Sequence, residues 1–328
     1  MNSTGTMACR LAAAALVLAG LFALLPGSTD STQQKRAKKP DAAQIRRDSI
    51  AATVRTDSVR RVERARATAD SLRVVEENLA RRRADSIKAA QLRRLPNQAF
   101  ALGERLVFDV NYGYVTAGEA VLSIPAHDSV SGRQCYRVEV AINSSTSFSV
   151  FYRVEDRYLT FIDVETLAPW QFEQHIREGG YRRDFVANFD QRRGIATTTD
   201  GGTYETPRYV HDIMSAFYYV RSLDLSTMQK GDELELKNFY KDKTHDLVVR
   251  VLGREELEVE AGTFRTIVVE PLVREGGLFK SEGRIVVWLT DDERKVPVRV
   301  NTKVVIGSID TELREYSGLR GPINARIK

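Results

Sequence analysis

Short runs of alternating apolar and polar residues, separated by turn-forming residues, occupy the chain from Gly103 almost to its end. Leu106, Phe108 and Val110 show the period of two that is typical of a strand with one buried face. No long crossover helix recurs between successive runs, as parallel strands would require. The pattern therefore predicts a mainly β fold with one large antiparallel sheet, and it argues against a doubly wound nucleotide-binding fold.

Strands are expected wherever this alternation continues between turn signals, and the expected turns include Thr116–Glu119, Gly179–Gly180, Gly253, Gly276–Gly277 and Thr302–Lys303. The expected ranges are 105–112, 120–125, 134–143, 151–161, 170–178, 181–189, 195–199, a short strand near 204, 233–240, 245–252, 255–259, 264–270, 284–289, 296–301 and 304–316.

One long apolar run in this region does not alternate, His211–Leu223. Apolar residues recur at i, i+3, i+4 and i+7 from Ile213 to Val220, and further apolar residues cover much of the remaining surface, so a helix here must be buried. Asp212 is a suitable N-cap, and Arg221 lies in the last turn, where a cation suits the helix dipole. The alternative is a buried strand, because the Phe and Tyr residues of this run have high β-propensity.

About 225 residues can bury a substantial core, and so many strands must curl or fold over one another. A half-open barrel wrapped around the internal helix satisfies both the apolar helix and a sheet with one apolar face. A two-sheet sandwich with the helix at one end is the alternative. The expected β domain covers residues 96–320, followed by a tail over residues 321–328.

The first 30 residues resemble a secretory signal peptide. Leu11–Leu25 is an apolar run of fifteen residues that ends at Pro26-Gly27. As a helix it would be roughly 22 Å long, which is shorter than the ~30 Å hydrocarbon core of a membrane. The chain is therefore expected to be exported to the periplasm or cell envelope. An uncleaved N-terminal anchor remains the alternative.

Residues 31–95 form a basic, helix-prone or disordered linker. Residues 35–95 hold 18 Lys and Arg against 8 Asp and Glu, so the net charge of +5 for the whole chain comes from this segment. Residues 41–94 lack Gly and Pro, which favours helix, but their apolar stripe is thin for a coiled coil. The segment is either a solvated spacer or a contact to an anionic membrane surface or wall polymer. Nucleic acid is not an expected partner of an exported chain.

The sequence carries no readable catalytic or metal-binding motif. After removal of a signal peptide that contains Cys9, only Cys135 remains, so no intramolecular disulfide can form, and packing is its expected role. The four histidines show no metal-ligand spacing, and no nucleophile elbow, phosphate loop or dinucleotide fingerprint occurs. We expect no catalytic residue, metal or cofactor.

The order of several short segments resembles one exported bacterial family, which is catalogued as domain of unknown function 3108. The resemblance implies a β-rich envelope domain and brings no established activity. The segments that carry it are Gly103-Glu104-x-Leu106, Tyr112-x-x-Val115-x-Ala117-Gly118-x-Ala120, Phe151-Tyr152-x-Val154-x-Asp156-Arg157, Pro169 to Phe172, Asp212-Ile213-Met214-Ser215-Ala216-Phe217-Tyr218-Tyr219-x-Arg221, Gly231-Asp232, Ala261-Gly262-Thr263-Phe264, Val286 to Thr290, Val296-Pro297-Val298 and Ile306-Gly307-Ser308-Ile309.

Aromatic and basic side chains supply the candidate ligand site. Phe217, Tyr218 and Trp170 could line an apolar cavity inside a curved sheet, with Arg221 and Arg157 meeting a carboxylate or phosphate head group. Ordinary core packing is the preferred explanation of the aromatics, because aromatic side chains fill any large β core. A buried ion pair with Asp156 explains the arginines as well as a ligand head group does. The leading hypothesis is a non-enzymatic envelope protein that binds a lipid-like or glycan-like ligand or a partner protein. An envelope hydrolase and a purely structural scaffold are the alternatives.

Overall fold

The computed structural model describes residues 61, 64–80, 92–273, 284–304 and 307–328. Residues 92–328 belong to one compact unit, and the helix over residues 64–80 belongs to another. The predicted signal peptide or anchor, most of the predicted linker and the turn expected at Gly276-Gly277 lie outside the described residues.

The helix over residues 64–80 is exposed along its whole length. Arg73 and Glu77 form an exposed i, i+4 ion pair at 3.6 Å, a contact that adds a few tenths of a kcal/mol, roughly, to a helix. Leu72, Val75 and Leu79 form an apolar stripe with side chains about half exposed. The coiled-coil hypothesis stays a prediction. None of the helices in the described part of the chain is both long and apolar enough to cross a membrane.

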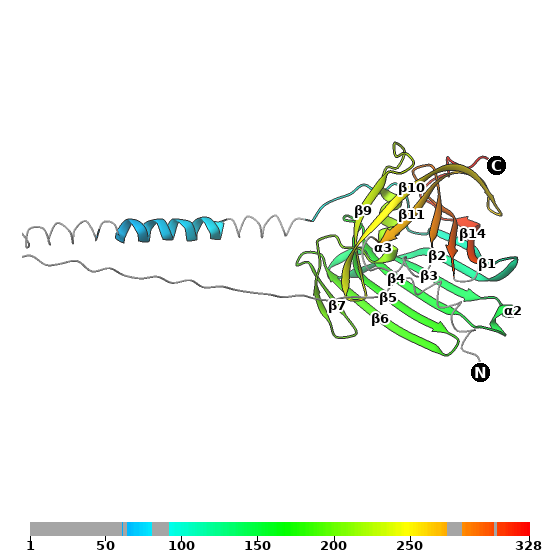
Figure 1. Cartoon of the computed structure of the whole chain (residues 1–328), viewed down its shortest axis with the longest axis horizontal. Coiled ribbons are helices and arrows are strands. Elements are labelled where there is room, and N and C mark those ends of the chain that lie inside the picture. The colour runs from blue at the N-terminus through cyan, green and yellow to red at the C-terminus, as the bar shows by residue number, and fades with distance from the viewer. Residues whose placement is uncertain (1–60, 62–63, 81–91, 274–283, 305–306) are drawn as a thin grey trace, which may run out of the picture. The chain divides into compact units, whose positions relative to one another are not determined.

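Fourteen strands and two short helices make up the β unit (Figure 1). Their bounds are β1 Arg105–Tyr112, β2 Val115–Val130, β3 Arg133–Ser144, α2 Thr146–Ser149, β4 Glu155–Asp163, β5 Pro169–Glu178, β6 Tyr181–Asp190, β7 Ile195–Thr198, β8 Thr203–Glu205, α3 Ile213–Ser222, β9 Glu233–Tyr240, β10 Lys243–Val259, β11 Gly262–Val273, β12 Ile285–Thr290, β13 Pro297–Lys303 and β14 Ser308–Ser317.

All the strands belong to one antiparallel sheet, in the order β8-β7-β6-β5-β4-β3-β2-β1-β14-β13-β12-β11-β10-β9. Two meanders, β1–β8 and β9–β14, are therefore joined where β1 pairs with β14. The prediction of a mainly β fold with one large antiparallel sheet is confirmed.

The sheet curves until its two ends approach one another. His211, just before α3, donates its backbone N–H to the carbonyl of Lys237 at 2.9 Å and accepts from the N–H of Phe239 at 2.7 Å, so it pairs with the edge strand β9. The Phe239 ring also packs edge-to-face against Phe189 of β6, with centroids 5.8 Å apart. The result is the half-open, barrel-like form of the two predicted architectures.

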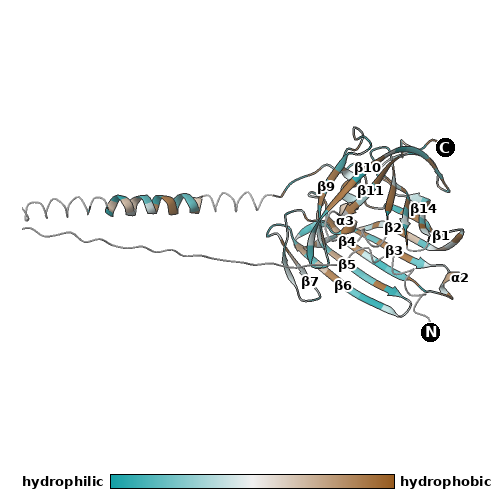
Figure 2. Cartoon of the chain, in the orientation of Figure 1, coloured by the Kyte–Doolittle hydropathy of each residue, from teal (hydrophilic) through white to brown (hydrophobic). Residues whose placement is uncertain are grey.

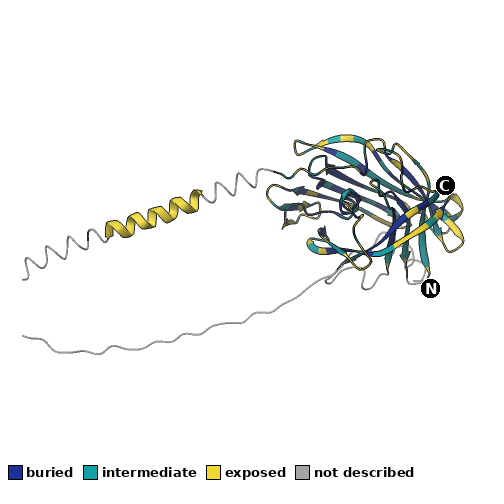
Figure 3. Ribbon diagram, turned by 90° about the horizontal axis from the view of Figure 1, so that it is seen from above, coloured by how far each residue is buried: buried dark blue, intermediate teal, exposed yellow. Residues whose placement is uncertain are grey.

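Helix α3 lies within the curve of the sheet (Figure 3). The Asp212 side chain accepts from the backbone N–H groups of Met214 and Ser215, and Arg221 occupies the last turn. Both expected features of the helix ends are confirmed, and the strand alternative is wrong. Packing against strands on both sides decides for helix over the β-propensity of the aromatic run.

Several expected boundaries differ from the structure. Gly253 is not a turn but a bulge with φ of +146° inside the long strand β10, a backbone conformation that favours glycine. The β1–β2 turn lies at Gly113-Tyr114 instead of Thr116–Glu119, and Thr302-Lys303 lies within β13. Part of the strand expected over residues 151–161 is irregular, because the single turn of α2 and the residues after it precede β4.

The expected tail, residues 321–328, is docked on the β unit. Ile323 and Ala325 are buried in the core, and Arg326 bridges to Phe264 of β11. The compact unit also begins earlier than residue 96, because the Leu95 N–H donates to the Glu165 carbonyl at 2.8 Å. The residues that make these contacts lie in short segments without a hydrophobic period, so the sequence does not predict either contact.

Candidate ligand cavity

A cavity of about 350 Å³ lies between α3 and the inner faces of both meanders. One face of α3 forms a wall of it, and this is the i, i+3, i+4, i+7 face that begins at Ile213 and ends at Val220. The inner faces of β3–β4 and β10–β13 form the other walls. The cavity therefore lies between α3 and strands that belong to both meanders.

The lining is almost entirely apolar, and Figure 2 shows the hydrophobic character of β10, β11 and α3. It consists of Val140, Ile142 and Tyr158 from the first meander, Ile213, Met214, Ala216, Phe217 and Val220 from α3, and Leu247, Val249, Val269, Pro271, Ile285, Val287, Leu289, Val300 and Thr302 from the second meander. Such a surface suits a hydrocarbon chain, because it offers contacts and few polar groups.

The Tyr158 hydroxyl is the buried polar group of this lining that lacks a hydrogen-bond partner among the described residues. Gln174 lies directly opposite Tyr158 on β5, and its side chain opposes the rise in the pKa of this hydroxyl. Burial raises the pKa of Tyr158 well above its ordinary value, and the negative charges of Asp156 and Glu178 add to the shift. The hydroxyl therefore stays protonated and can donate a hydrogen bond.

A second, smaller cavity of about 50 Å³ shares Tyr158 and Ile213 with the first. Its lining adds polar side chains, among them Gln174, Arg183 and Asp212. Tyr158 thus stands between an apolar space and a more polar one.

The opposite side of α3 is packed and paired. The Arg221 guanidinium donates to both carboxylate oxygens of Glu104, at 2.7 and 2.9 Å, and both side chains are fully buried. Burial alone lowers the pKa of Arg221, but the Glu104 carboxylate outweighs it, and the net shift is upward. Tyr218 is also fully buried and packs edge-to-face on Phe100, with centroids 4.7 Å apart.

Trp170 belongs to a separate core cluster with Cys135, Leu159 and Phe161. Its indole N–H donates to Asp163 at 3.0 Å. Cys135 is fully buried there, more so than the half-buried position expected from its alternating run, and burial raises the pKa of its thiol to about 12. A packing role for this cysteine fits that environment.

Arg157 points to the exposed side of β4, where its Nε donates to Glu139 at 2.6 Å. Of the five predicted ligand-binding residues, only Phe217 lines the main cavity. Tyr218 and Arg221 lie on the other face of α3, and Trp170 is in another cluster. The two arginines pair with Glu139 and Glu104 and not with Asp156.

The sequence reasoning missed the strand residues of the cavity, such as Ile142, Tyr158, Val287 and Val300. Their alternation identifies them as inward-facing. However, the same alternation describes a filled core equally well, and only the spacing between the walls shows that space remains.

His211, Asp212 and Ser215 carry the residue types of a hydrolytic triad without its geometry. The Asp212 carboxylate bonds to the Ser215 N–H and the Thr160 hydroxyl, and no hydrogen bond links it to the His211 ring. All three residues are buried, and burial lowers the pKa of His211 to about 3, with the charge of Arg93 contributing. These residues cap helix α3 and hold its first turn in place.

No group of three or more His, Cys, Asp or Glu side chains in the described part of the chain could hold a metal ion. The main cavity offers a ligand apolar contacts and few hydrogen bonds.

Comparison with known proteins gives distant structural similarity. No curated protein matches the chain. A β-barrel-like protein of domain of unknown function DUF1849 from Brucella abortus superposes with a TM-score of 0.44 at 8% identity, covering 66% of this chain and 97% of its own. A predicted lipoprotein from Parabacteroides distasonis gives a TM-score of 0.31 at 12% identity, covering 69% and 100%. A predicted exported protein with a YmcC-like fold from Bacteroides fragilis gives 0.28 at 12% identity, covering 70% and 100%.

The family comparison is more direct. One family model, described as a protein of unknown function, matches residues 107–314, which include both meanders and α3. The resemblance found in the sequence is thereby confirmed, and the chain belongs to the DUF3108 family.

Proposed function

We propose that this chain is an exported, non-enzymatic envelope protein whose β unit binds the apolar chain of a neutral amphiphile in the main cavity. The observation that carries the proposal is the apolar space of about 350 Å³ beside α3. The N-terminal apolar run Leu11–Leu25 supports export.

The cavity is large enough for part of a single hydrocarbon chain, since small-molecule sites begin at about 300 Å³. Each methylene moved from water into such a space gains about 0.8 kcal/mol. A segment of eight methylenes therefore gains roughly 6 kcal/mol before the cost of ordering the ligand is subtracted. A glycan is a poorer candidate for this space, because its hydroxyls would lose their hydrogen bonds to water against aliphatic walls.

The polar group of the ligand is best placed at Tyr158, whose hydroxyl can donate a hydrogen bond. Burial, together with Asp156 and Glu178, raises the pKa of this hydroxyl, so it stays protonated. A carboxylate or phosphate would lose its hydration against the apolar walls of the main cavity at high cost, whereas an alcohol, ester or amide would lose far less. We therefore favour a neutral long-chain amphiphile.

The test is binding of matched twelve-carbon probes to the full chain, measured by calorimetry. Dodecanol should bind more tightly than dodecanoate at pH 8, and maltose should not bind. Native mass spectrometry and organic extraction of the freshly exported protein should return a neutral amphiphile. No binding of dodecanol by protein shown to be free of bound lipid would overturn the proposal.

We also propose that residues 31–95 hold the protein near an anionic membrane surface or wall polymer, because that segment is strongly basic. The deletion that tests this should span residues 41–91 and retain Leu92, since the residues that follow are docked on the β unit. The shortened chain should lose binding to anionic vesicles at low salt, and unchanged binding would contradict the proposal.

A further inference from the structure

Two connections of the β unit expose large apolar side chains to solvent. In the β1–β2 connection, Tyr114 is fully exposed and Val115 is 59% exposed. In the segment after α2, Val150 is 80% exposed and Phe151 is 86% exposed. Single exposed apolar residues are common, but several together on neighbouring turns mark an interaction surface.

The two connections lie side by side. The backbone N–H of Ser145, which caps α2, donates to the Ala117 carbonyl of β2 at 2.8 Å, and its hydroxyl donates to the Thr116 carbonyl at 3.4 Å. We use the name aromatic rim for the surface made by Tyr114, Val115, Val150 and Phe151.

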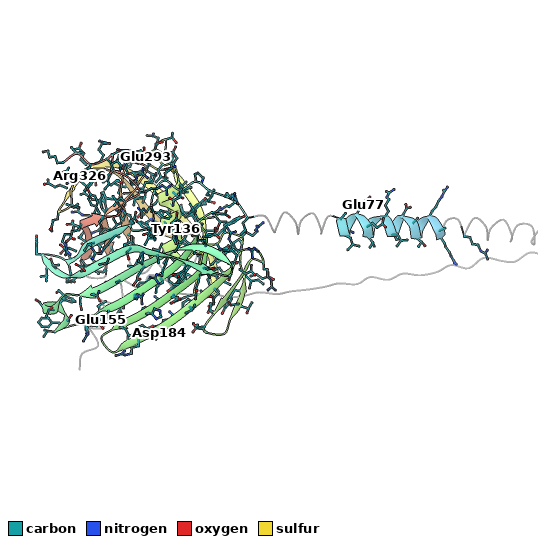
Figure 4. The ribbon with its side chains drawn as sticks, turned by 180° about the vertical axis from the view of Figure 1, so that it is seen from behind. Glu77, Tyr136, Glu155, Asp184, Glu293 and Arg326 are labelled. Atoms are coloured by element: carbon teal, nitrogen blue, oxygen red, sulfur yellow. The ribbon has the colours of Figure 1, made fainter. Side chains whose placement is uncertain are left out.

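The aromatic rim lies next to the end of β3 that helps to line the main cavity. Ile142, a lining residue of β3, is three residues before Ser145. Figure 4 marks Glu155 at the strand end beside α2. Phe100, Tyr218 and Ile323 pack together in one core cluster and do not line the main cavity.

The chemistry of the aromatic rim fits the interfacial zone of a lipid bilayer. Tyrosine combines an apolar ring with a hydroxyl that can stay hydrated, and phenylalanine and valine supply the apolar contact. Arg153 and Glu155, two and four residues after Phe151, form an ion pair at 2.5 Å and so carry no net charge between them. Such a surface has no need of anionic lipid.

We propose that the aromatic rim docks on the surface of a neutral lipid bilayer and holds the cavity-lining end of β3 near the pool of amphiphiles there. The purpose of the docking, which is to give the cavity access to amphiphiles, rests on the proposed function. The docking itself is a separate property.

The test is partition of the full chain onto phosphatidylcholine vesicles in about 0.5 M salt, which screens the basic segment. The rim variant Tyr114→Ser/Val150→Ser/Phe151→Ser is compared with a control variant that removes exposed apolar side chains elsewhere, Leu102→Ser/Tyr181→Ser/Ile327→Ser. The rim variant should lose at least about tenfold in partition coefficient, and the control should stay within about twofold of the native chain. Thermal unfolding confirms that both variants are folded.

Two results would overturn the docking proposal. One is a native chain that does not partition onto neutral vesicles, and the other is a rim variant that partitions as the native chain does. Dodecanol titration separates this from the cavity hypothesis: the rim variant should bind the soluble probe with native affinity. Rim-dependent partition without any dodecanol binding would retain the docking surface and reject the cavity ligand.

Discussion

The two faces of α3 meet opposite environments. On one face, Arg221 is paired with Glu104 and Tyr218 packs on Phe100, so both polar and apolar groups have partners. On the other face, Phe217 and its neighbours border a space of about 350 Å³. One short helix is therefore firmly fixed on one side and only partly packed on the other.

Under the proposed function, this difference separates stability from ligand binding. Unfilled apolar space costs dispersion contacts, so a chain under selection for stability alone would fill it with larger side chains. The buried ion pair fixes the position of the helix. The cavity can therefore stay open without packing contacts on the face of the helix that borders it. We infer that the paired face positions the helix and that the other face serves the ligand.

The largest effect is expected from breaking the paired face. Arg221→Met leaves the Glu104 carboxylate buried without its partner and should lower the free energy of unfolding by roughly 3–5 kcal/mol. Chemical denaturation measures the loss. The matched control is Arg157→Met, because its half-exposed pair with Glu139 should contribute no more than about 1 kcal/mol. Equal losses in the two variants would contradict the special role of the paired face.

Filling the other face should remove binding with little loss of stability. Val300→Phe places about three additional methylene equivalents in the cavity, and at about 0.8 kcal/mol each this should weaken dodecanol binding about 50-fold. Calorimetric titration checks the affinity, and unfolding should change by less than about 1.5 kcal/mol. Native affinity in this variant would place the ligand elsewhere.

The start of α3 should make stability sensitive to acid. The pKa of His211 is about 3 in the folded chain and about 6.5 when unfolded. As pH falls below 6.5 the unfolded state takes up a proton and the folded state does not, so this stabilisation is complete above that pH and is lost between about 6.5 and 3.

At about 1.4 kcal/mol per pH unit, the native chain should lose roughly 2 kcal/mol from this group between pH 7 and pH 5. His211→Gln removes that contribution, so its stability should fall less steeply over the same range. Parallel curves for the two proteins would show that His211 does not remain neutral in the folded chain.

The smallest effect concerns the polar contact at Tyr158. Tyr158→Phe removes a hydroxyl with no partner in the described structure, so stability should be unchanged or slightly higher. The affinity for dodecanol should fall about fivefold, which corresponds to about 1 kcal/mol for one hydrogen bond. The affinity for dodecane should not change. An equal loss for both probes would indicate a packing effect.

The sequence predicted the parts of the fold that depend on local periodicity. The alternation seen in Leu106 and Phe108 identified strands, and Asp212 with Arg221 marked the helix ends, because capping and burial act over a few residues. The bulge at Gly253 was mistaken for a turn, since glycine with a positive φ serves both. The docking of Ile323 and Ala325 depends on contacts with distant residues and left no local pattern.

The candidate site was predictable only in part. The helix face that includes Phe217 was visible from its spacing, but Tyr218, one residue away, points to the filled side. The partner of Arg221 is 117 residues earlier in the chain, at Glu104, a separation at which sequence patterns give no pairing information. Whether the space beside the helix is filled depends on the distance between two meanders, which alternation cannot report.

The most direct test of the central claim is to locate a bound chain. The protein is crystallised with 12-bromododecanol, and the bromine is located by its anomalous scattering. The account predicts one bromine position between α3 and β12, in contact with Phe217 and Val287, and its loss in Val300→Phe crystals grown in the same way. Ordered native crystals in which the bromine lies outside this cavity, or does not bind at all, would contradict the account.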